Sequence, residues 1–341
     1  MDTQKLDQTY IANTYARFPV TIVKGKGSLV WDDTGKEYID LSTGIAVDIF
    51  GVADEEWMAA VTKQLGTLQH ISNLYYTEPC VKLAQMLCEK TGMKKVFFGN
   101  SGAEANECAI KAARKWSEEK KGKDYSTIIT LKNSFHGRTI TTLAATGQDV
   151  FHHDFTPLTE GFVYAEPNDL ANLEQLIKAN KCAAVMMEVV QGEGGVMPLD
   201  EAYVKGAAKL CEQYDLLLIC DEVQVGNGRS GKLYGYMHYG VQPDIVSTAK
   251  GLAGGLPLGA TLLGEKVQDV LSAGTHGSTF GGNPVCCAGA INVLSRLDEK
   301  MLEGVEERSA YIKQELAGAK GVLGVSGLGL MLGIQTEKNA S

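Results

Sequence analysis

Lys250 has an unusual position for a lysine, because it follows an apolar run that begins at Ile245 and precedes the glycine-rich segment 251–259. Backbone that lacks Cβ atoms approaches a side chain closely and desolvates it, which lowers the pKa of a lysine and exposes a neutral, nucleophilic amine. A lysine that forms Schiff bases needs this environment. The alternative is that Lys250 only caps the end of a strand.

Asp221 is the second candidate for chemistry. It ends the apolar run 216–220, which is too short for a typical helix and is predicted to be a buried strand. A carboxylate at the carboxyl end of such a strand lies where open α/β sheets bind ligands, and a buried anion needs a cationic partner. Beside a reactive lysine, the protonated ring nitrogen of pyridoxal phosphate meets that need, because this cofactor acts as an electron sink. The alternative is a helix N-cap.

A phosphate site is predicted around Ser101 and Gly102. Residues 96–98 are predicted to form a strand, and the residues after Gly99 show the spacing of one helix face: Ala105, Cys108, Ala109, Ala112, Ala113 and Trp116. Ser101 and Gly102 then lie at a helix N-terminus, where free N–H groups and the helix dipole bind phosphate. Ser101 as an ordinary N-cap explains the pattern equally well.

Six motifs together resemble the class III pyridoxal-phosphate aminotransferases in order and spacing. They are Asn-Ser-Gly-Ala-Glu-Ala (100–105), Ser-Phe-His-Gly-Arg (134–138), Gln-Gly-Glu-Gly-Gly (191–195), Asp-Glu-Val-Gln (221–224), Ala-Lys-Gly (249–251) and His-Gly-Ser-Thr-Phe-Gly-Gly-Asn-Pro (276–284). The resemblance runs from about Tyr15 to the end of the chain. It is closest to acetylornithine aminotransferases, which the stretches 24–33 and 44–47 also resemble.

The resemblance implies a role for each matching residue. Lys250 would bond covalently to the cofactor and then carry a proton between two carbons, while Asp221 would hold the proton of the ring nitrogen. The resemblance also implies that Phe135 and Val223 contact the two faces of the cofactor ring and that Gln224 bonds to the ring hydroxyl. The residues implied to bind the phosphate are Ser101, Gly102, Ala103, Ser278 and Thr279. Thr279 would reach the phosphate of a neighbouring subunit, which implies a homodimer with shared sites. Phe135 and Val223 as core residues, and Thr279 as a turn residue, are the alternatives.

Two further residues are implied to bind substrate. Arg138 resembles the arginine that binds the carboxylate remote from the reacting amine, and its planar fork suits bidentate recognition. A surface ion pair is the alternative for Arg138. Glu193 resembles a glutamate that pairs with a second arginine further along the chain. His136 receives no catalytic role.

The activity that the resemblance implies is transfer of the δ-amino group of N2-acetylornithine to 2-oxoglutarate, by ping-pong kinetics, in arginine biosynthesis. Another ω-amino donor (succinylornithine, ornithine or 4-aminobutyrate) is the alternative within enzymes. Family members usually continue past the last strand, so the chain is expected to be truncated at its carboxyl end, and a catalytically impaired homologue is the alternative outside enzymes. The segment 48–54 also departs from the family pattern.

The predicted fold class is α/β, similar to that of aspartate aminotransferase: a large, mostly parallel sheet covered by helices, plus a smaller α/β domain built from both chain ends. The expected boundaries are 1–55 for the first part of the small domain, 56–285 for the large cofactor-binding domain and 286–341 for the incomplete remainder. The predicted strands are 96–98, 127–131, 183–188, 216–220, 245–247, 261–264 and a last one at 328–334.

Composition and charge limit the partners, metal sites and location that we expect for the protein. The net charge of −9 argues against nucleic acid and anionic membranes as partners. Eight cysteines and six histidines show no metal-ligand spacing, so no metal site is predicted. No window approaches the ~18 apolar residues that a membrane span needs, and we expect a cytoplasmic protein.

Overall fold

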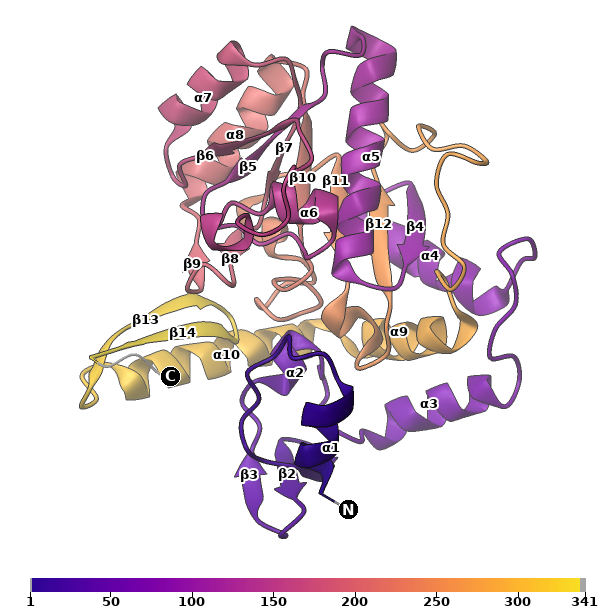
Figure 1. Cartoon of the computed structure of the whole chain (residues 1–341), viewed down its shortest axis with the longest axis vertical. Coiled ribbons are helices and arrows are strands. Elements are labelled where there is room, and N and C mark those ends of the chain that lie inside the picture. Colours follow the sequence, from indigo (N-terminus) through magenta and orange to yellow (C-terminus); the bar gives the residue numbers. More distant parts are fainter. Residues whose placement is uncertain (1, 338–341) are drawn as a thin grey trace.

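A computed structural model describes residues 2–337, and its centre is a seven-stranded sheet in the order β4-β12-β11-β10-β7-β5-β6 (Figure 1). The strands are β4 (Lys95–Gly99), β5 (Thr127–Leu131), β6 (Phe162–Ala165), β7 (Cys182–Met187), β10 (Leu217–Asp221), β11 (Ile245–Thr248) and β12 (Gly259–Leu263). The pairs that β12 forms with β11 and β4 are antiparallel, and the other pairs of the sheet are parallel. The predicted mostly parallel sheet is therefore confirmed.

Both faces of this sheet are buried, because successive residues of one strand enter two separate hydrophobic cores. In β7, Val185 and Met187 belong to one core, whereas Ala184 and Met186 belong to the other. Parallel strands covered on both faces carry continuous apolar runs instead of alternating ones. This explains why the strand sequences could be recognised as short uninterrupted runs. The missed strand, β6, lies at the edge of the sheet and is only partly buried.

Helix α5 (Gly102–Lys121) covers one face of the sheet and contributes Ala109, Ala113 and Trp116 to the second core. Other helices cover the opposite face, where Leu83 of α4 and Val204 of α8 enter the first core. The remaining helices of the large body are α3 (Glu55–Leu65), α4 (Glu78–Thr91), α6 (Ile140–Ala145), α7 (Leu170–Ala179), α8 (Glu201–Gln213), α9 (Pro284–Arg296) and the short 3-10 helices η1 (Asp149–Phe151), η2 (Gly235–Tyr239) and η3 (Lys250–Ala253).

The two ends of the chain lie below the large sheet in Figure 1. The first end forms α1 (Thr3–Tyr10), the antiparallel sheet β1 (Ile22–Lys26), β2 (Leu29–Asp32) and β3 (Glu37–Ile39), and the short α2 (Thr43–Ala46). The other end forms α10 (Glu299–Leu316) and the hairpin β13 (Val322–Leu328) and β14 (Met331–Thr336). A two-stranded ribbon, β8 (Val190–Gln191) and β9 (Met197–Pro198), completes the strands. The domain boundaries stay a prediction.

The single last strand predicted at 328–334 is wrong, because the chain turns within it. Gly329 has a φ of +53° and occupies the turn between β13 and β14. A Cβ on Gly329 would lie only 2.4 Å from the backbone of Ser230, so the turn packs tightly against the loop after β10. Leu328, Leu330 and Met331 are all apolar, and an apolar run that crosses a turn has no periodicity to reveal it.

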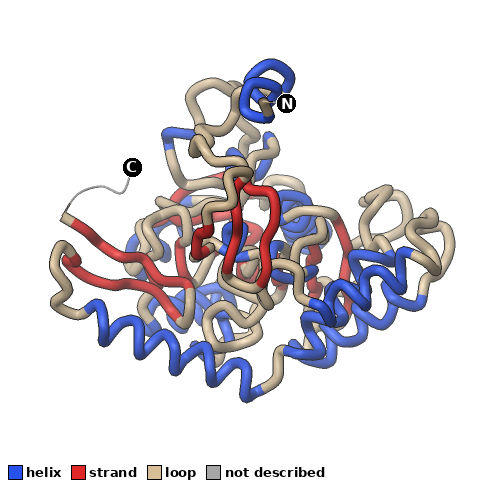
Figure 2. The backbone as a smooth tube through the Cα atoms, turned by 90° about the horizontal axis from the view of Figure 1, so that it is seen from below, coloured by secondary structure: helices blue, strands red, loops and turns tan. Residues whose placement is uncertain are grey.

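Helix α1 projects from the body (Figure 2) and has no buried residue. Within residues 2–337, every helix is too short or too polar to cross a membrane.

All eight cysteines are free thiols.

Candidate active site

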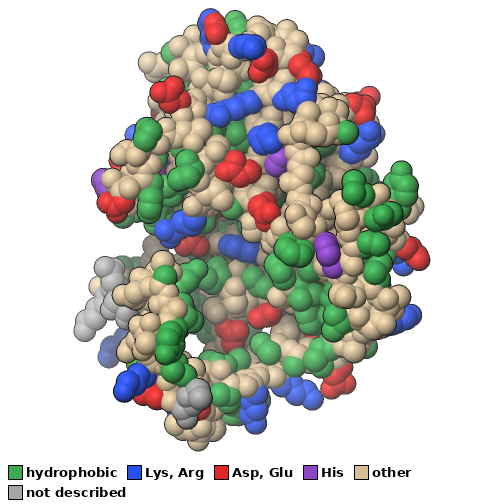
Figure 3. Space-filling model, turned by 45° about the vertical axis from the view of Figure 1, so that its right-hand side comes forward, with side chains coloured by type: hydrophobic (Ala, Val, Ile, Leu, Met, Phe, Trp, Pro, Cys, Tyr) green, Lys and Arg blue, Asp and Glu red, His purple; other side chains and the backbone are tan. Residues whose placement is uncertain are grey.

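The candidate residues converge where β10 and β11 end, beside the first turn of α5. Asp221 is the last residue of β10, and Lys250 opens η3 directly after β11. Ser101 is the N-cap of α5. The space-filling view shows a hollow between the body that holds the large sheet and the part below it, with basic and acidic side chains visible inside (Figure 3). This is the edge at which open α/β sheets bind ligands.

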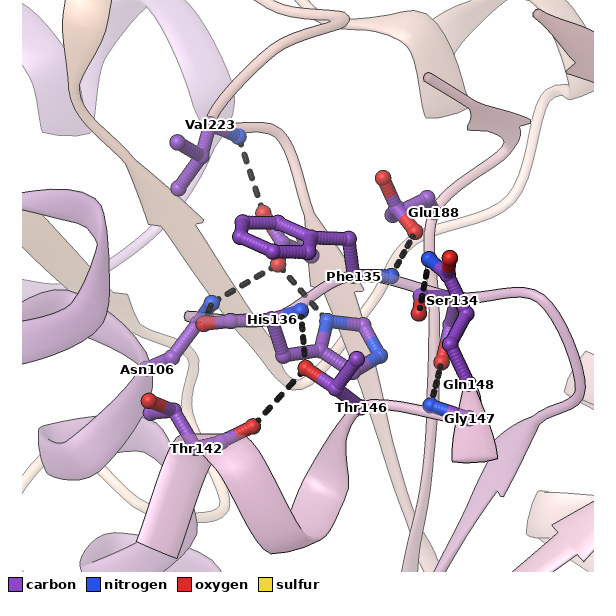
Figure 4. Close-up of polar contacts among 11 residues, drawn as sticks. Asn106, Ser134, Phe135, His136, Thr142, Thr146, Gly147, Gln148, Glu188 and Val223 are labelled. Atoms are coloured by element: carbon purple, nitrogen blue, oxygen red, sulfur yellow. Dashed lines mark hydrogen bonds and ion pairs between the residues drawn. The ribbon is translucent and has the colours of Figure 1, made fainter. Parts of the chain in front are cut away.

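Asp221 is buried, with 3% of its surface exposed, and is held by Asn106, His136 and Val223, which Figure 4 labels. Its Oδ2 accepts from Asn106 Nδ2 at 2.7 Å and lies 2.8 Å from His136 Nδ1. The one hydrogen bond that its Oδ1 accepts from residues 2–337 comes from the backbone N–H of Val223, at 3.0 Å, so a lone pair stays free for a cationic N–H. The N-cap alternative is wrong, since turns and not a helix follow β10.

His136 contacts the Asp221 carboxylate through Nδ1 and is itself buried. Burial disfavours the charged imidazole, but the hydrogen bond and the charge of Asp221 outweigh it, and the pKa of His136 is raised. Asn106 also donates to the backbone carbonyl of His136, at 2.8 Å, which fixes the two elements together. The sequence did not single out Asn106, and His136 was expected to have no catalytic role.

Glu188 is a third buried ionisable group and follows β7. Its Oε2 accepts the backbone N–H of Phe135 at 2.9 Å, so it fixes the residue proposed to stack on the cofactor. Burial raises the pKa of Glu188, while the neighbouring His136 acts in the opposite direction. The only sequence signal for Glu188 was its place at the end of a predicted strand.

Lys250 has the features that a reactive amine requires. Burial lowers its pKa, and the charges of Asp221 and Glu193 partly oppose this. Its φ of +47° lies in the left-handed region, which is strained for a residue with a side chain and is typical of functional sites. Among residues 2–337, we find no hydrogen-bond or ion-pair partner for its amine. Lys250 therefore does not cap β11, which ends at Thr248.

The first turn of α5 combines a cap with free donors. Ser101 Oγ accepts the N–H of Glu104 at 3.2 Å, so Ser101 is an N-cap, as the alternative predicted. No acceptor in the described part of the chain reaches the N–H groups of Gly102 and Ala103, which stay available for an anion. A Cβ on Gly102 would lie 2.6 Å from Val223, so this close approach requires glycine.

The loop 276–283 lies beside the same helix end. Ser278 Oγ accepts from Asn100 Nδ2 at 3.2 Å and from the N–H of Gly281 at 3.0 Å. Thr279 is exposed, and its side chain has no hydrogen bond to the rest of residues 2–337. On the other side of the site, Gln224 Nε2 donates to Glu193 Oε1 at 3.2 Å, so these two predicted residues contact each other.

Arg138 is exposed and lies against aromatic rings. Its Cζ is 4.2 Å from the ring centroid of Phe151 and 5.6 Å from that of Phe135. No carboxylate within residues 2–337 forms an ion pair with it, so the surface ion pair is not observed. The structure thus brings Arg138 next to Phe135, the residue predicted to stack on the cofactor.

The comparisons with known proteins agree with this geometry. The family model "Aminotransferase class-III" matches residues 10–341. The chain is 51% identical to an acetylornithine aminotransferase of Haemophilus ducreyi, covering 98% of this chain and 86% of that one. It is 45% identical to a succinylornithine transaminase of Citrobacter koseri, covering 95% and 80%. Its fold is similar to the crystal structure of the ornithine aminotransferase of Toxoplasma gondii, with a TM-score of 0.94, 35% identity, and coverage of 99% and 82%.

Proposed function

The chain belongs to the class III aminotransferases, and on this premise we propose that it transfers the δ-amino group of N2-acetylornithine to 2-oxoglutarate. As an aminotransferase it takes an amino donor and an oxo-acid acceptor. The observation that carries the chemistry is a desolvated lysine amine next to a buried carboxylate that His136 and Asn106 hold. The choice of donor rests on the 51% identity to an acetylornithine aminotransferase.

Enzymes of this family use pyridoxal phosphate, which supplies an electron sink for the carbanion that forms at the substrate carbon. The site meets the needs of that group in three ways. Among residues 2–337, nothing else bonds to the second lone pair of Asp221 Oδ1, to the amine of Lys250 or to the first N–H groups of α5, so these groups are available for the ring N–H, the covalent bond and the phosphate. We assign Lys250 to the covalent bond and the proton transfer, and Asp221 to the ring nitrogen.

The remaining assignments follow from position. Phe135 and Val223 would contact the two faces of the cofactor ring. Phe135 is held by the carboxylate of Glu188, and Val223 packs against Gly102 at the start of α5. Gln224 would bond to the ring hydroxyl, and Glu193, its present partner, would face the substrate.

The phosphate would be held by backbone donors and by hydroxyl groups. We assign it to Ser101, Gly102 and Ala103 of one chain, together with Ser278 and Thr279 of a second copy. Arg138 would bind the carboxylate of the donor that lies farthest from the reacting amine, because its N–H groups have no other acceptor among residues 2–337.

A homodimer would complete the site. Leu74, Tyr76 and Phe280 are large and apolar, with 87%, 99% and 59% of their surface exposed. They flank Thr279, because Asn73 donates to the carbonyls of Ser278 and Gly281 and His70 packs on Phe280. Exposed apolar groups of this size are typical of interaction surfaces. Dilution should therefore release cofactor and activity together, whereas a fully active monomer would refute the shared site.

The test is a panel of amino donors with 2-oxoglutarate as acceptor, followed by glutamate formation. We expect the highest kcat/KM with N2-acetylornithine and lower values with succinylornithine, ornithine and 4-aminobutyrate. Lys250→Ala is the control, since it removes the reacting amine and should abolish turnover with every donor. A higher kcat/KM with another donor would contradict the proposal that N2-acetylornithine is the substrate. Wild-type rates no higher than those of Lys250→Ala would contradict the proposal that the protein is an aminotransferase that uses Lys250.

A further inference from the structure

Arg138 packs against two aromatic rings and, among residues 2–337, forms no ion pair with a carboxylate, the usual partner of an arginine. Its guanidinium carbon lies 4.2 Å from the centroid of the Phe151 ring and 5.6 Å from that of Phe135. The two rings contact each other edge to face, with their centroids 5.8 Å apart and their planes at 75°. Phe135 is in turn fixed through its N–H to the buried carboxylate of Glu188. A chain of contacts thus runs from the buried part of the site to an exposed arginine.

Phe151 is the closer of the two rings to Arg138, and it comes from a different segment. It ends the short helix η1, whereas Phe135 and Arg138 belong to one loop after β5. A ring placed over a guanidinium orders it through a cation–π interaction. It also leaves the N–H edges free, because ring carbon atoms accept no strong hydrogen bond. The arrangement therefore orients an arginine without occupying its donors.

We propose that Phe151 is a positioning residue that holds Arg138 in the orientation that binds a substrate carboxylate, and so sets the affinity for carboxylate-bearing substrates. The inference rests on the assignment of Arg138 under the proposed function. Without the Phe151 ring, the long arginine side chain regains rotamer freedom and has to lose it when the carboxylate binds. Within residues 2–337, the aromatic and cation–π contacts of Phe151 are with Phe135 and Arg138, so we expect the main effect on substrate binding and a smaller one on the reacting end through Phe135.

The experiment measures binding of glutarate, a dicarboxylate that has no amine or oxo group and cannot react, to the holoenzyme by calorimetry. Phe151→Leu removes the ring, and Phe151→Met serves the same purpose if the leucine variant does not fold. We expect glutarate to bind about fivefold more weakly, the fold-change that about 1 kcal/mol gives. KM should rise by the same factor for both carboxylate substrates, while kcat at saturation stays within about twofold. Phe151→Tyr keeps a ring and should bind glutarate as the wild type does.

Phe155→Leu is the matched control, because Phe155 is an exposed phenylalanine that follows η1 and has no ring contact with Arg138. Glutarate affinity that is unchanged in Phe151→Leu, or reduced equally in Phe155→Leu, would overturn the proposal. Arg138→Ala separates this from the parent assignment. If Arg138→Ala weakens glutarate binding and Phe151→Leu does not, only the role of Phe151 is wrong. If Arg138→Ala has no effect, the assignment of Arg138 to a carboxylate is wrong as well.

Discussion

The two ends of the site are built in opposite ways. At the buried end, Asp221 is held by hydrogen bonds from Asn106, His136 and the backbone of Val223, all between 2.7 and 3.0 Å. At the open end, Arg138 is exposed and is held by two aromatic rings, without a hydrogen bond or ion pair to the rest of residues 2–337. One end fixes a charge by polar contacts, and the other orients a charge and leaves its donors free.

The difference predicts how each end responds to mutation. A buried acceptor that loses its donor costs about 1–3 kcal/mol, and the loss reaches the neighbouring groups of the network. An exposed cation over a ring contributes about 0.5–1 kcal/mol. We therefore expect large effects on rate at the Asp221 end and moderate effects on substrate affinity at the Arg138 end.

The largest effect is expected for Asp221→Asn. A neutral amide cannot stabilise the proton on the cofactor ring, so kcat should fall about a thousandfold, roughly 4 kcal/mol on the barrier. Cofactor content, measured by absorbance after release, should stay near that of the wild type. A fall below about tenfold, roughly 1.4 kcal/mol, would mean that Asp221 has only a structural role.

Asn106→Ala should have the next largest effect. It removes one donor to Asp221 and the donor to the His136 carbonyl, and leaves both acceptors buried. We expect kcat to fall by roughly 5–150-fold, as a loss of about 1–3 kcal/mol gives. Asn180→Ala, at the end of α7, is the control, because it deletes the same side chain away from the site. Equal kinetics in the two variants would contradict the support role of Asn106.

Arg138→Lys tests the open end. Lysine keeps the charge but lacks the planar fork and packs less well over the rings, so KM should rise about tenfold for both the donor and 2-oxoglutarate. The value of kcat should change less than KM. An unaltered KM for both substrates would show that Arg138 does not bind a carboxylate.

The last effect concerns stability instead of catalysis and belongs to the buried end. Burial raises the pKa of Glu222 to about 8 from 4.5, although the N–H groups of Gly235 and Tyr236 act against this. Between these two values, the folded protein keeps a proton that the unfolded chain loses. Stability therefore falls as pH rises through this window, by up to about 1.4 kcal/mol per pH unit.

Replacing this carboxyl removes that pH dependence. Denaturant unfolding of Glu222→Gln should show a flatter decline of the free energy of unfolding than the wild type between pH 4.5 and about 8. Glu212→Gln, at an exposed position of α8, is the control and should follow the wild type. Parallel curves for Glu222→Gln and the wild type would show that Glu222 does not titrate in this window.

Much of this comparison follows from the sequence, and its supporting contacts do not. The apolar runs before Asp221 and Lys250 predict two buried strands, and parallel strands bring their carboxyl ends to one edge. The contacts of Asn106 with Asp221 join residues 115 positions apart, and no local pattern encodes such a pair. The same applies to Phe151 over Arg138, where an aromatic residue in a loop is indistinguishable from a core residue.

The central claim is that Lys250 is the residue whose amine bonds to the cofactor. Borohydride reduction of the holoenzyme fixes a lysine-bound cofactor permanently, and peptide mass mapping then identifies the modified residue. We expect a single pyridoxyl group on the peptide that contains Lys250, and none on the same peptide of Lys250→Ala. A modified lysine elsewhere in the chain, or no modification at saturating cofactor, would contradict it.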